Sequence, residues 1–163
     1  MFSIKLLALF CTAATAAVLP RSQYVPNGSC CFTLHEATTS NMIQQEQRTG
    51  FLFLDSSRPN GWYCLDLADQ YKILFDEFNN ACIINSDLKF QCLDPTPGLT
   101  QYSLQQIGSQ VLLTVDGTTD YKACPAQNGG EMIWGAQRAS DPGCRTLQLT
   151  AKGLKGTCNG LSG

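Results

Sequence analysis

The chain has 163 residues, of which 44% are hydrophobic and 15% are charged, and its formal net charge is −2. This apolar content excludes a disordered chain, and the length fits one domain. A weakly acidic chain without clustered lysine and arginine is also a poor nucleic-acid binder, so we expect no nucleic-acid partner.

The first 17 residues have the features of a signal peptide. Lys5 precedes an apolar run that is shorter than the roughly 20 residues needed to span a bilayer, and residues 14–17 supply small side chains for cleavage. We therefore expect a secreted, monomeric protein with no membrane span. Residues 18–29 would form a short linker, residues 30–158 the domain, and residues 159–163 a polar tail unlike the hydrophobic end of a GPI signal.

Cysteine is abundant, with nine residues, of which Cys11 lies in the leader. The other eight are an even number, which in a small secreted chain predicts four disulfides. They are Cys30, Cys31, Cys64, Cys82, Cys92, Cys124, Cys144 and Cys158. A metal site is the competing interpretation, but no Cys-x-x-Cys pair occurs and His35 is the single histidine. We expect no metal, no cofactor and no catalytic residue.

The domain begins close to a glycosylation signal. Asn27 opens the single Asn-x-Ser/Thr sequon of the chain, which we expect in an exposed turn and glycosylated. Residues 31–35 alternate as a strand, with His35 on its polar face, where no nearby carboxylate would orient the ring for catalysis. The glutamine-rich stretch 36–49 predicts a helical turn or an exposed loop.

Apolar strands are expected next at 51–54 and 62–67, and the residues between them have turn-forming composition. The segment 71–92 predicts a strand and a hairpin around which the rest of the chain is organised. Tyr71, Ile73 and Phe75 alternate with the residues between them, which indicates a strand with one buried face.

The second half of the chain, after a breaker at 94–98, continues with short strands. They are predicted at 102–107, 111–115, 118–124, 132–134 and 146–151. Asp116-Gly117 predicts a hairpin between two of them, because both central positions of such a turn need positive φ. No segment predicts a helix of substantial length.

These short strands predict an all-β fold, a small disulfide-bonded antiparallel β barrel or sandwich. A β-trefoil-like fold with three loose repeats is the alternative, because aromatic-led strands begin at Phe32, Tyr71 and Tyr102.

Hairpin geometry suggests how the cysteines pair. Cys82 and Cys92 are symmetric about Asp87, so a hairpin centred there would place them opposite one another. Cys124 and Cys144 would close a loop that contains Trp134. Cys30 or Cys31 would pair with Cys158, and Cys64 with whichever of the two remains. Each bridge could contribute about 3–4 kcal/mol to the free energy of unfolding.

Candidate binding residues are aromatic. Trp62, Tyr63 and Trp134 lie near glycine-rich turns and could stack on sugar rings. The alternative is that both tryptophans are core residues that pack on disulfides. Two pairs of carboxylates, Asp66 with Asp69 and Asp76 with Glu77, are candidates for glycosidic chemistry, which requires two opposed carboxyl groups. They fall in turns or at strand ends, where such residues usually face water, so we expect no catalysis from them.

Several motifs occur in a recognisable order. They are Cys31-Phe32-Thr33-Leu34, Ala81-Cys82-Ile83-Ile84, Phe90-Gln91-Cys92, Tyr102-Ser103-Leu104, Tyr121-Lys122-Ala123-Cys124-Pro125, and Cys144 followed by Leu147-Gln148-Leu149-Thr150. Over residues 30–158 this order resembles fungal secreted proteins related to the C-terminal domain of the PIR cell-wall mannoproteins. No glutamine-rich repeat array precedes Cys30, and Cys64 and the Cys30–Cys31 pair exceed the expected cysteine set, which indicates a divergent member.

The resemblance implies a secreted, non-enzymatic, wall-associated structural protein of fungi. Its partner would be wall polysaccharide or a wall protein. The alternative is a secreted effector or glycan-binding interaction protein, and a small carbohydrate-active enzyme ranks last.

Overall fold

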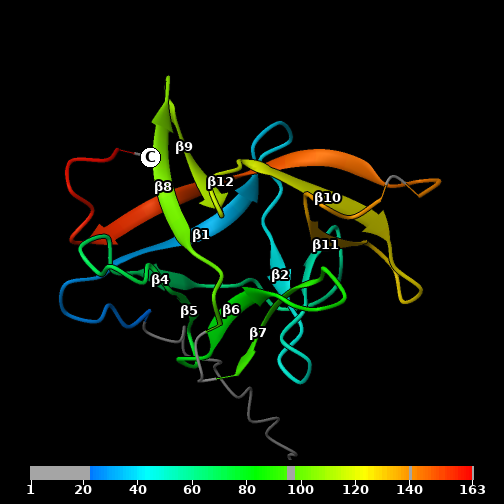
Figure 1. The fold of residues 1–163 in the computed structure, drawn as a ribbon, viewed down its shortest axis with the longest axis horizontal. Helices are drawn as coiled ribbons and strands as arrows, with labels where there is room; N and C mark the ends of the chain where they lie inside the picture. Colours follow the sequence, from blue (N-terminus) through cyan, green and yellow to red (C-terminus); the bar gives the residue numbers. More distant parts are fainter. Residues whose placement is uncertain (1–22, 95–97, 140, 163) are drawn as a thin grey trace, which may run out of the picture.

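The computed structural model describes residues 23–94, 98–139 and 141–162, which form an all-β fold (Figure 1). These residues contain twelve strands, all paired antiparallel, and no helix. The strands are β1 (Cys30–Glu36), β2 (Gln44–Gln45), β3 (Leu52–Leu54), β4 (Tyr63–Leu65), β5 (Leu74–Asp76), β6 (Ala81–Ile84), β7 (Phe90–Asp94), β8 (Tyr102–Ile107), β9 (Gln110–Val115), β10 (Asp120–Pro125), β11 (Glu131–Gly135) and β12 (Arg145–Gly156). The predicted leader, most of the linker and residues 95–97 of the breaker lie outside the described residues.

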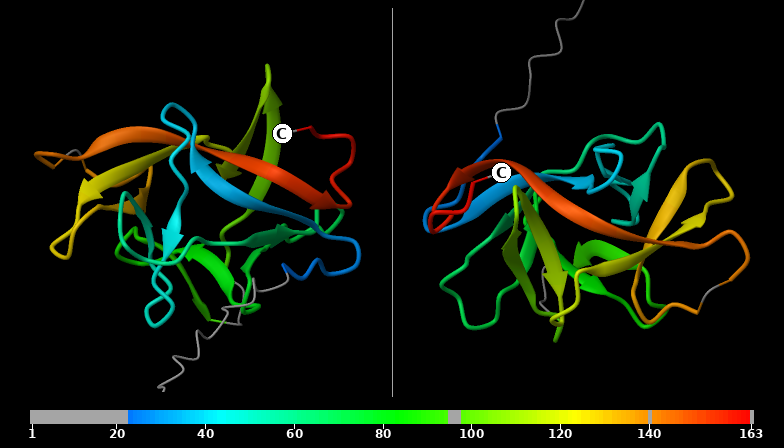
Figure 2. Two further views of the ribbon diagram at one scale, coloured as in Figure 1. Left: turned by 180° about the vertical axis from the view of Figure 1, so that it is seen from behind. Right: turned by 90° about the horizontal axis from the view of Figure 1, so that it is seen from above.

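The strands form one sheet that curls into a half-barrel, and β12 is the strand that joins its two halves. Its first residues pair with β10, Thr150 pairs with β9, and the remainder pairs with β1. In Figure 2, viewed from above, β12 crosses the length of the molecule. The predicted strand at 146–151 is therefore correct in position but shorter than the twelve residues observed.

The sheet comes close to closing where β7 approaches β3 and β11. The main-chain N–H of Cys92 donates to the carbonyl of Gly50 at 2.9 Å, and Gly135 N–H donates to Leu88 at 2.8 Å. Gly50 is required here, because a Cβ would lie 2.1 Å from the Cys92 carbonyl oxygen. This seam places residues from three distant segments on one surface. The strand order has no threefold pattern, so the trefoil alternative is not adopted.

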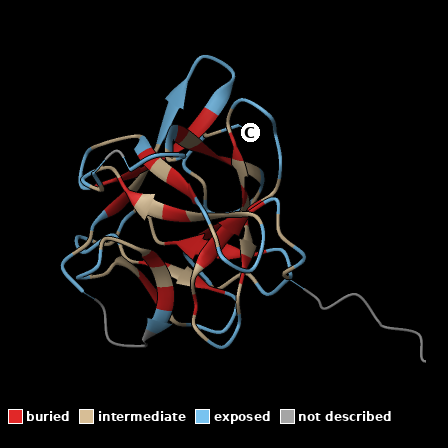
Figure 3. Cartoon of the chain, turned by 90° about the vertical axis from the view of Figure 1, so that its right-hand side faces the viewer, coloured by how far each residue is buried: buried red, intermediate tan, exposed pale blue. Residues whose placement is uncertain are grey.

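The buried residues gather between the curled strands (Figure 3), and they include aliphatic side chains and a stack of three aromatic rings. The Phe90 ring lies 5.7 Å from the ring centres of both Tyr102 and Tyr121. Burial raises the pKa of both tyrosines well above the ordinary value. The Tyr121 hydroxyl donates to the Leu113 carbonyl, whereas the Tyr102 hydroxyl has no hydrogen-bond partner among the described residues.

Four disulfides cross-link the strands. Two of them are the predicted pairs, Cys82 with Cys92 and Cys124 with Cys144. The sequence left open which of the two adjacent cysteines pairs with Cys158. The structure pairs Cys30 with Cys158 and Cys31 with Cys64. The Cys30–Cys158 bridge joins the beginning of β1 to the segment after β12, and it spans 128 residues of sequence. Such a bridge removes much conformational freedom from the unfolded chain.

Two predicted strand features differ from the structure. In β5 the buried side chains are Leu74 and Asp76, whereas Phe75 is half-buried and Tyr71 is 60% exposed, so the opposite face of the strand is buried. Asp116 and Gly117 do form the expected turn with positive φ. Only the Val115–Thr118 bridge follows it, because β9 continues along β8 and β12 while β10 pairs with β11 and β12.

The glutamine-rich stretch before β3 also differs from expectation. It contributes β2, which pairs with β3, and it places the Gln45 side chain in the interior. The amide nitrogen of Gln45 donates to the buried carboxylate of Asp76 at 2.7 Å. The glutamines are therefore not all surface residues, because one of them supplies a hydrogen bond to a buried acidic side chain.

Candidate functional site

The three predicted glycan-contact residues have different environments. Tyr63 is fully buried in β4 and has no accessible surface for a glycan, so that prediction is wrong. The same burial raises the pKa of its hydroxyl. Trp62 is only 5% exposed. Trp134 is half-buried at the surface and keeps an accessible side chain.

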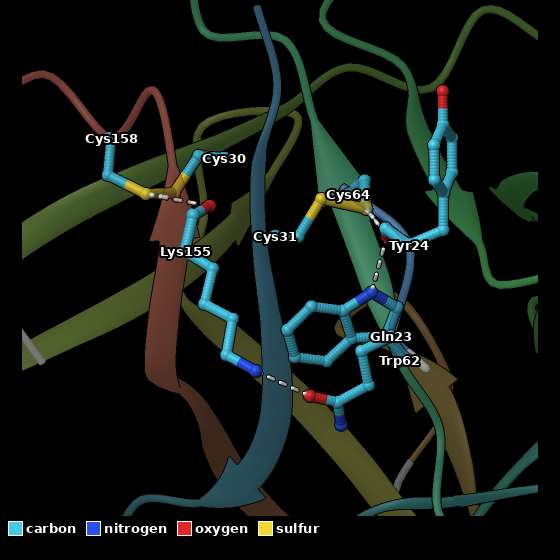
Figure 4. The surroundings of a disulfide bond; sticks show 8 residues. All are labelled: Gln23, Tyr24, Cys30, Cys31, Trp62, Cys64, Lys155 and Cys158. Atoms are coloured by element: carbon cyan, nitrogen blue, oxygen red, sulfur yellow. Dashed lines mark hydrogen bonds between the residues drawn. A yellow bond between two sulfur atoms is a disulfide. The ribbon is translucent and has the colours of Figure 1, made fainter. Parts of the chain in front are cut away.

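Trp62 belongs to a small apolar cluster built on a disulfide. Its indole packs with Cys31 and Cys64, and Lys155 lies over the ring (Figure 4). Val25 also packs against this cluster. The indole Nε1–H donates to the Tyr24 carbonyl at 3.2 Å. The alternative interpretation, a tryptophan that packs on a disulfide, is therefore correct for Trp62.

A cavity of about 550 Å³ borders this cluster, between residues 23–29 and the turn after β5. Asp76 and Glu77 contribute carboxylates to its lining. Asp76 is occupied by structural hydrogen bonds, since Oδ1 accepts from the main-chain N–H groups of Phe78 and Asn80 and Oδ2 accepts from Gln45. This carboxylate holds a turn and a neighbouring strand in place.

The candidate site is a groove of about 400 Å³ at the seam between β3, β7 and β11, which we call the Trp134 groove. Its lining includes three aromatic residues, two cations and one carboxylate. They are Phe51, Phe53, Trp134, Arg58, Lys89 and Glu46. Clefts with apolar walls and a few convergent polar groups are where small ligands and sugars usually bind.

Local sequence explains why Trp134 faces outward. In β11, Ile133 and Gly135 are buried and the alternate positions, including Trp134, lie on the other face. Lys89 and Trp134 are bridge partners across the seam. Gly135 permits this approach, because a Cβ at that position would lie 2.8 Å from the Ile84 side chain.

Cations lie over the aromatic rings of the groove. The Lys89 Nζ is 5.4 Å from the ring centres of both Phe51 and Trp134. The Arg138 guanidinium carbon lies 4.1 Å from the Trp134 ring centre, and that of Arg58 lies 3.6 Å from Phe53. All four distances are within the roughly 6 Å range of cation–π attraction.

The remaining residues considered from the sequence have structural roles. His35 Nδ1 donates to the Ser40 carbonyl at 2.9 Å, and its Nε2 contacts the Thr33 hydroxyl. Asp66 and Asp69 accept main-chain N–H groups two residues further on, which is the usual Asx-turn arrangement. None of these contacts positions a group for proton transfer.

Asn27 is exposed, in a turn closed by a hydrogen bond from the Ser29 N–H to the Pro26 carbonyl at 3.2 Å. The position is accessible to a glycosylating enzyme. Its modification stays a prediction.

A charged network joins the end of β1 to β11 and β12. Arg145 bonds both Glu36 and Glu131, and the Glu36 side chain is only 3% exposed. The hydrogen bond from Arg145 lowers the pKa of Glu36, and the two glutamates raise the pKa of Arg145. A carboxylate held this firmly as an anion is suited to stabilising the sheet and poorly suited to donating a proton.

Sequence reasoning identified Trp134 but missed its partners. They come from several segments that the half-barrel brings together, so no local pattern unites them. One signal was available: Arg58 follows Phe53, and Arg138 follows Trp134, by four or five residues across a turn. That spacing allows an arginine to fold back over a strand aromatic.

Among the described residues, no group of three or more histidine, cysteine, aspartate or glutamate side chains is arranged to hold a metal ion. Within the same residues, no helix is long and apolar enough to cross a membrane. No protein-family model, curated protein or solved structure matches the chain. Its function is therefore inferred from the chemistry of the groove and from its sequence motifs.

Proposed function

We propose that this chain is a secreted, non-enzymatic protein of the fungal cell wall, held there by non-covalent contacts between the Trp134 groove and wall polysaccharide. Four disulfides support the extracellular part of the proposal, because such bridges persist in oxidising compartments. The fungal wall is suggested by the ordered motifs that resemble the C-terminal domain of PIR proteins.

The observation that carries the proposal is the groove itself. Trp134 and Phe51 are partly accessible, and the buried Phe53 also contributes to the lining. Aromatic side chains provide large contact areas at a small loss of side-chain entropy, which suits repeated weak contacts along a polymer.

Binding is favoured over catalysis by the state of the carboxylates. The two buried carboxylates that we describe, Glu36 and Asp76, are each held by several hydrogen bonds. A glycosidase would need one carboxyl group free to donate a proton and a second placed opposite it. The pairs considered from the sequence do not provide this arrangement, since Asp66, Asp69 and Asp76 stabilise turns.

The test is retention of the purified mature protein on insoluble chitin, β-glucan and mannan, together with extraction of native walls by detergent, reductant and alkali. Retention on at least one polymer, and release from walls without breaking covalent bonds, are expected. Trp134→Ala should lose retention while it remains folded. Absence of retention on every polymer, or recovery only in the medium, would remove the proposal.

A further inference from the structure

The cations of the Trp134 groove change which sugars it can accept. Lys89 and Arg138 lie near the Trp134 ring, and Arg58 lies over Phe53. A neutral sugar stacks through its C–H groups on an open aromatic face, and a cation over that face competes with it. A ligand that enters this groove therefore meets N–H donors as well as rings.

Two of these cations have weak, replaceable partners. Lys89 pairs with Asp87 at 3.3 Å, and the Asp87 side chain is 68% exposed. Arg138 pairs with Asp141, which is 50% exposed. Exposed pairs of this kind contribute only about 0–1 kcal/mol, so an incoming anion can replace the carboxylate at little cost.

Arg58 has no ion-pair partner among the described residues, and its guanidinium is held over Phe53. A guanidinium presents N–H groups in a planar fork that matches carboxylate and phosphate oxygens. Two donors at or beside the groove also lack acceptors. The Nε1 of Trp134 and the Nε of Arg138 are both buried and have no hydrogen-bond partner in the described part of the chain.

One carboxylate in the groove would repel an anionic ligand. Glu46 lines the groove, and it accepts a hydrogen bond from the Thr49 hydroxyl. Two cations still face one carboxylate in the lining, and Arg138 adds a further positive charge beside Trp134. The lining of the groove thus carries one more cation than carboxylate, and Asp87 and Asp141, which pair with Lys89 and Arg138, are not lining residues.

We infer that the Trp134 groove selects polysaccharides that carry carboxylate or phosphodiester groups over neutral polysaccharides of the same kind. This inference rests on the proposed function and names its substrate class. Arg58 would bind the anionic group through its fork, Lys89 would supply a second charge, and Trp134 would contact the sugar ring beside them.

The test measures the affinity of the mature protein for polygalacturonate, for phosphomannan and for neutral mannan. At low salt, at least one acidic polymer should bind about tenfold more tightly than neutral mannan, and the preference should shrink as salt screens the contact. If only one acidic polymer binds, that result identifies whether carboxylate or phosphodiester is recognised.

Arg58→Gln should reduce the affinity for the acidic polymer about tenfold and leave the affinity for neutral mannan unchanged. Arg48→Gln is the matched control, because Arg48 is exposed and does not line the groove. Melting curves establish that both variants remain folded.

Equal affinity for acidic and neutral polymers, or an Arg58→Gln variant indistinguishable from Arg48→Gln, would overturn the inference while the proposed function stands. Retention on none of these polymers, nor on chitin or β-glucan, would remove both.

Discussion

The two tryptophans of the chain occupy regions with opposite properties. Trp62 lies over the Cys31–Cys64 disulfide, with its indole N–H satisfied by the main chain of Tyr24. Trp134 lies on the seam of the half-barrel, with cations over its ring and its N–H unpaired within the described residues. The first arrangement uses an aromatic residue to stabilise the fold, and the second leaves one available for a ligand.

The largest expected effect separates these two regions by stability. Trp62→Ala should lower the free energy of unfolding by about 3–5 kcal/mol, because it removes a large buried side chain and leaves a cavity. Trp134→Ala should lower it by only about 1–2 kcal/mol, since it removes cation–π contacts at a partly exposed site. Denaturant unfolding of both variants measures the difference, and equal losses would break the contrast.

The disulfide beneath Trp62 gives the next prediction. Replacing Cys31 and Cys64 by alanine should lower the free energy of unfolding by about 3–4 kcal/mol, because the unfolded chain gains freedom when the bridge is absent. Trp62 packs on this bridge. In the variant that lacks both Trp62 and the bridge, the loss of unfolding free energy should therefore differ from the sum of the two separate losses. If the two losses of free energy simply add, Trp62 and the Cys31–Cys64 disulfide do not stabilise the fold as one unit.

Trp62 and Trp134 could not have been separated from the sequence alone. Each lies close to glycine, and the burial of Trp62 depends on residues 23–26, which fold back over β4. By contrast, the pairing of Cys82 with Cys92 was predictable because a short hairpin fixes it locally. The failure at β5 has a similar cause, because Asp76 is buried only where Gln45 and the following turn supply its hydrogen bonds.

The groove was less predictable than the fold for the same reason. Alternation along β11 could indicate that Trp134 lies on one face, but not which distant residues face it. Lys89 reaches Trp134 because the sheet curls, and that curvature is a property of the whole set of strands. Contacts between residues this far apart in the chain cannot be predicted from a short stretch of sequence.

A third prediction concerns the charged network in which Arg145 joins β1 to β11 and β12. Glu36→Gln should lower the free energy of unfolding by about 1–3 kcal/mol at neutral pH, because it weakens a charged hydrogen bond to Arg145. The folded pKa of Glu36 lies below its ordinary value of 4.5. The stabilisation is therefore present above that value and is lost as pH falls through the folded pKa.

Unfolding curves recorded from neutral pH to the acid range test this pH dependence of the stabilisation by Glu36. The gap between wild type and Glu36→Gln should narrow as the solution becomes more acidic. Polysaccharide retention by the variant should be unchanged, since Glu36 does not line the groove. A gap that widens in acid would contradict the assigned role.

The smallest effect concerns Asn27, near the Trp62 region. Asn27→Gln should abolish a glycan without moving the free energy of unfolding by more than about 0.5 kcal/mol, because the side chain is exposed. Mass spectrometry of the secreted protein, with and without glycosidase treatment, measures the modification. An unmodified wild-type protein would remove this prediction and leave the comparison of the two tryptophans intact.

The most direct test of the account compares polysaccharide retention with stability in Trp134→Ala. The account predicts that retention falls to background while the variant keeps most of the wild-type free energy of unfolding. Retention equal to that of wild type, in a variant shown to be folded, would contradict the assignment of this groove as the binding surface.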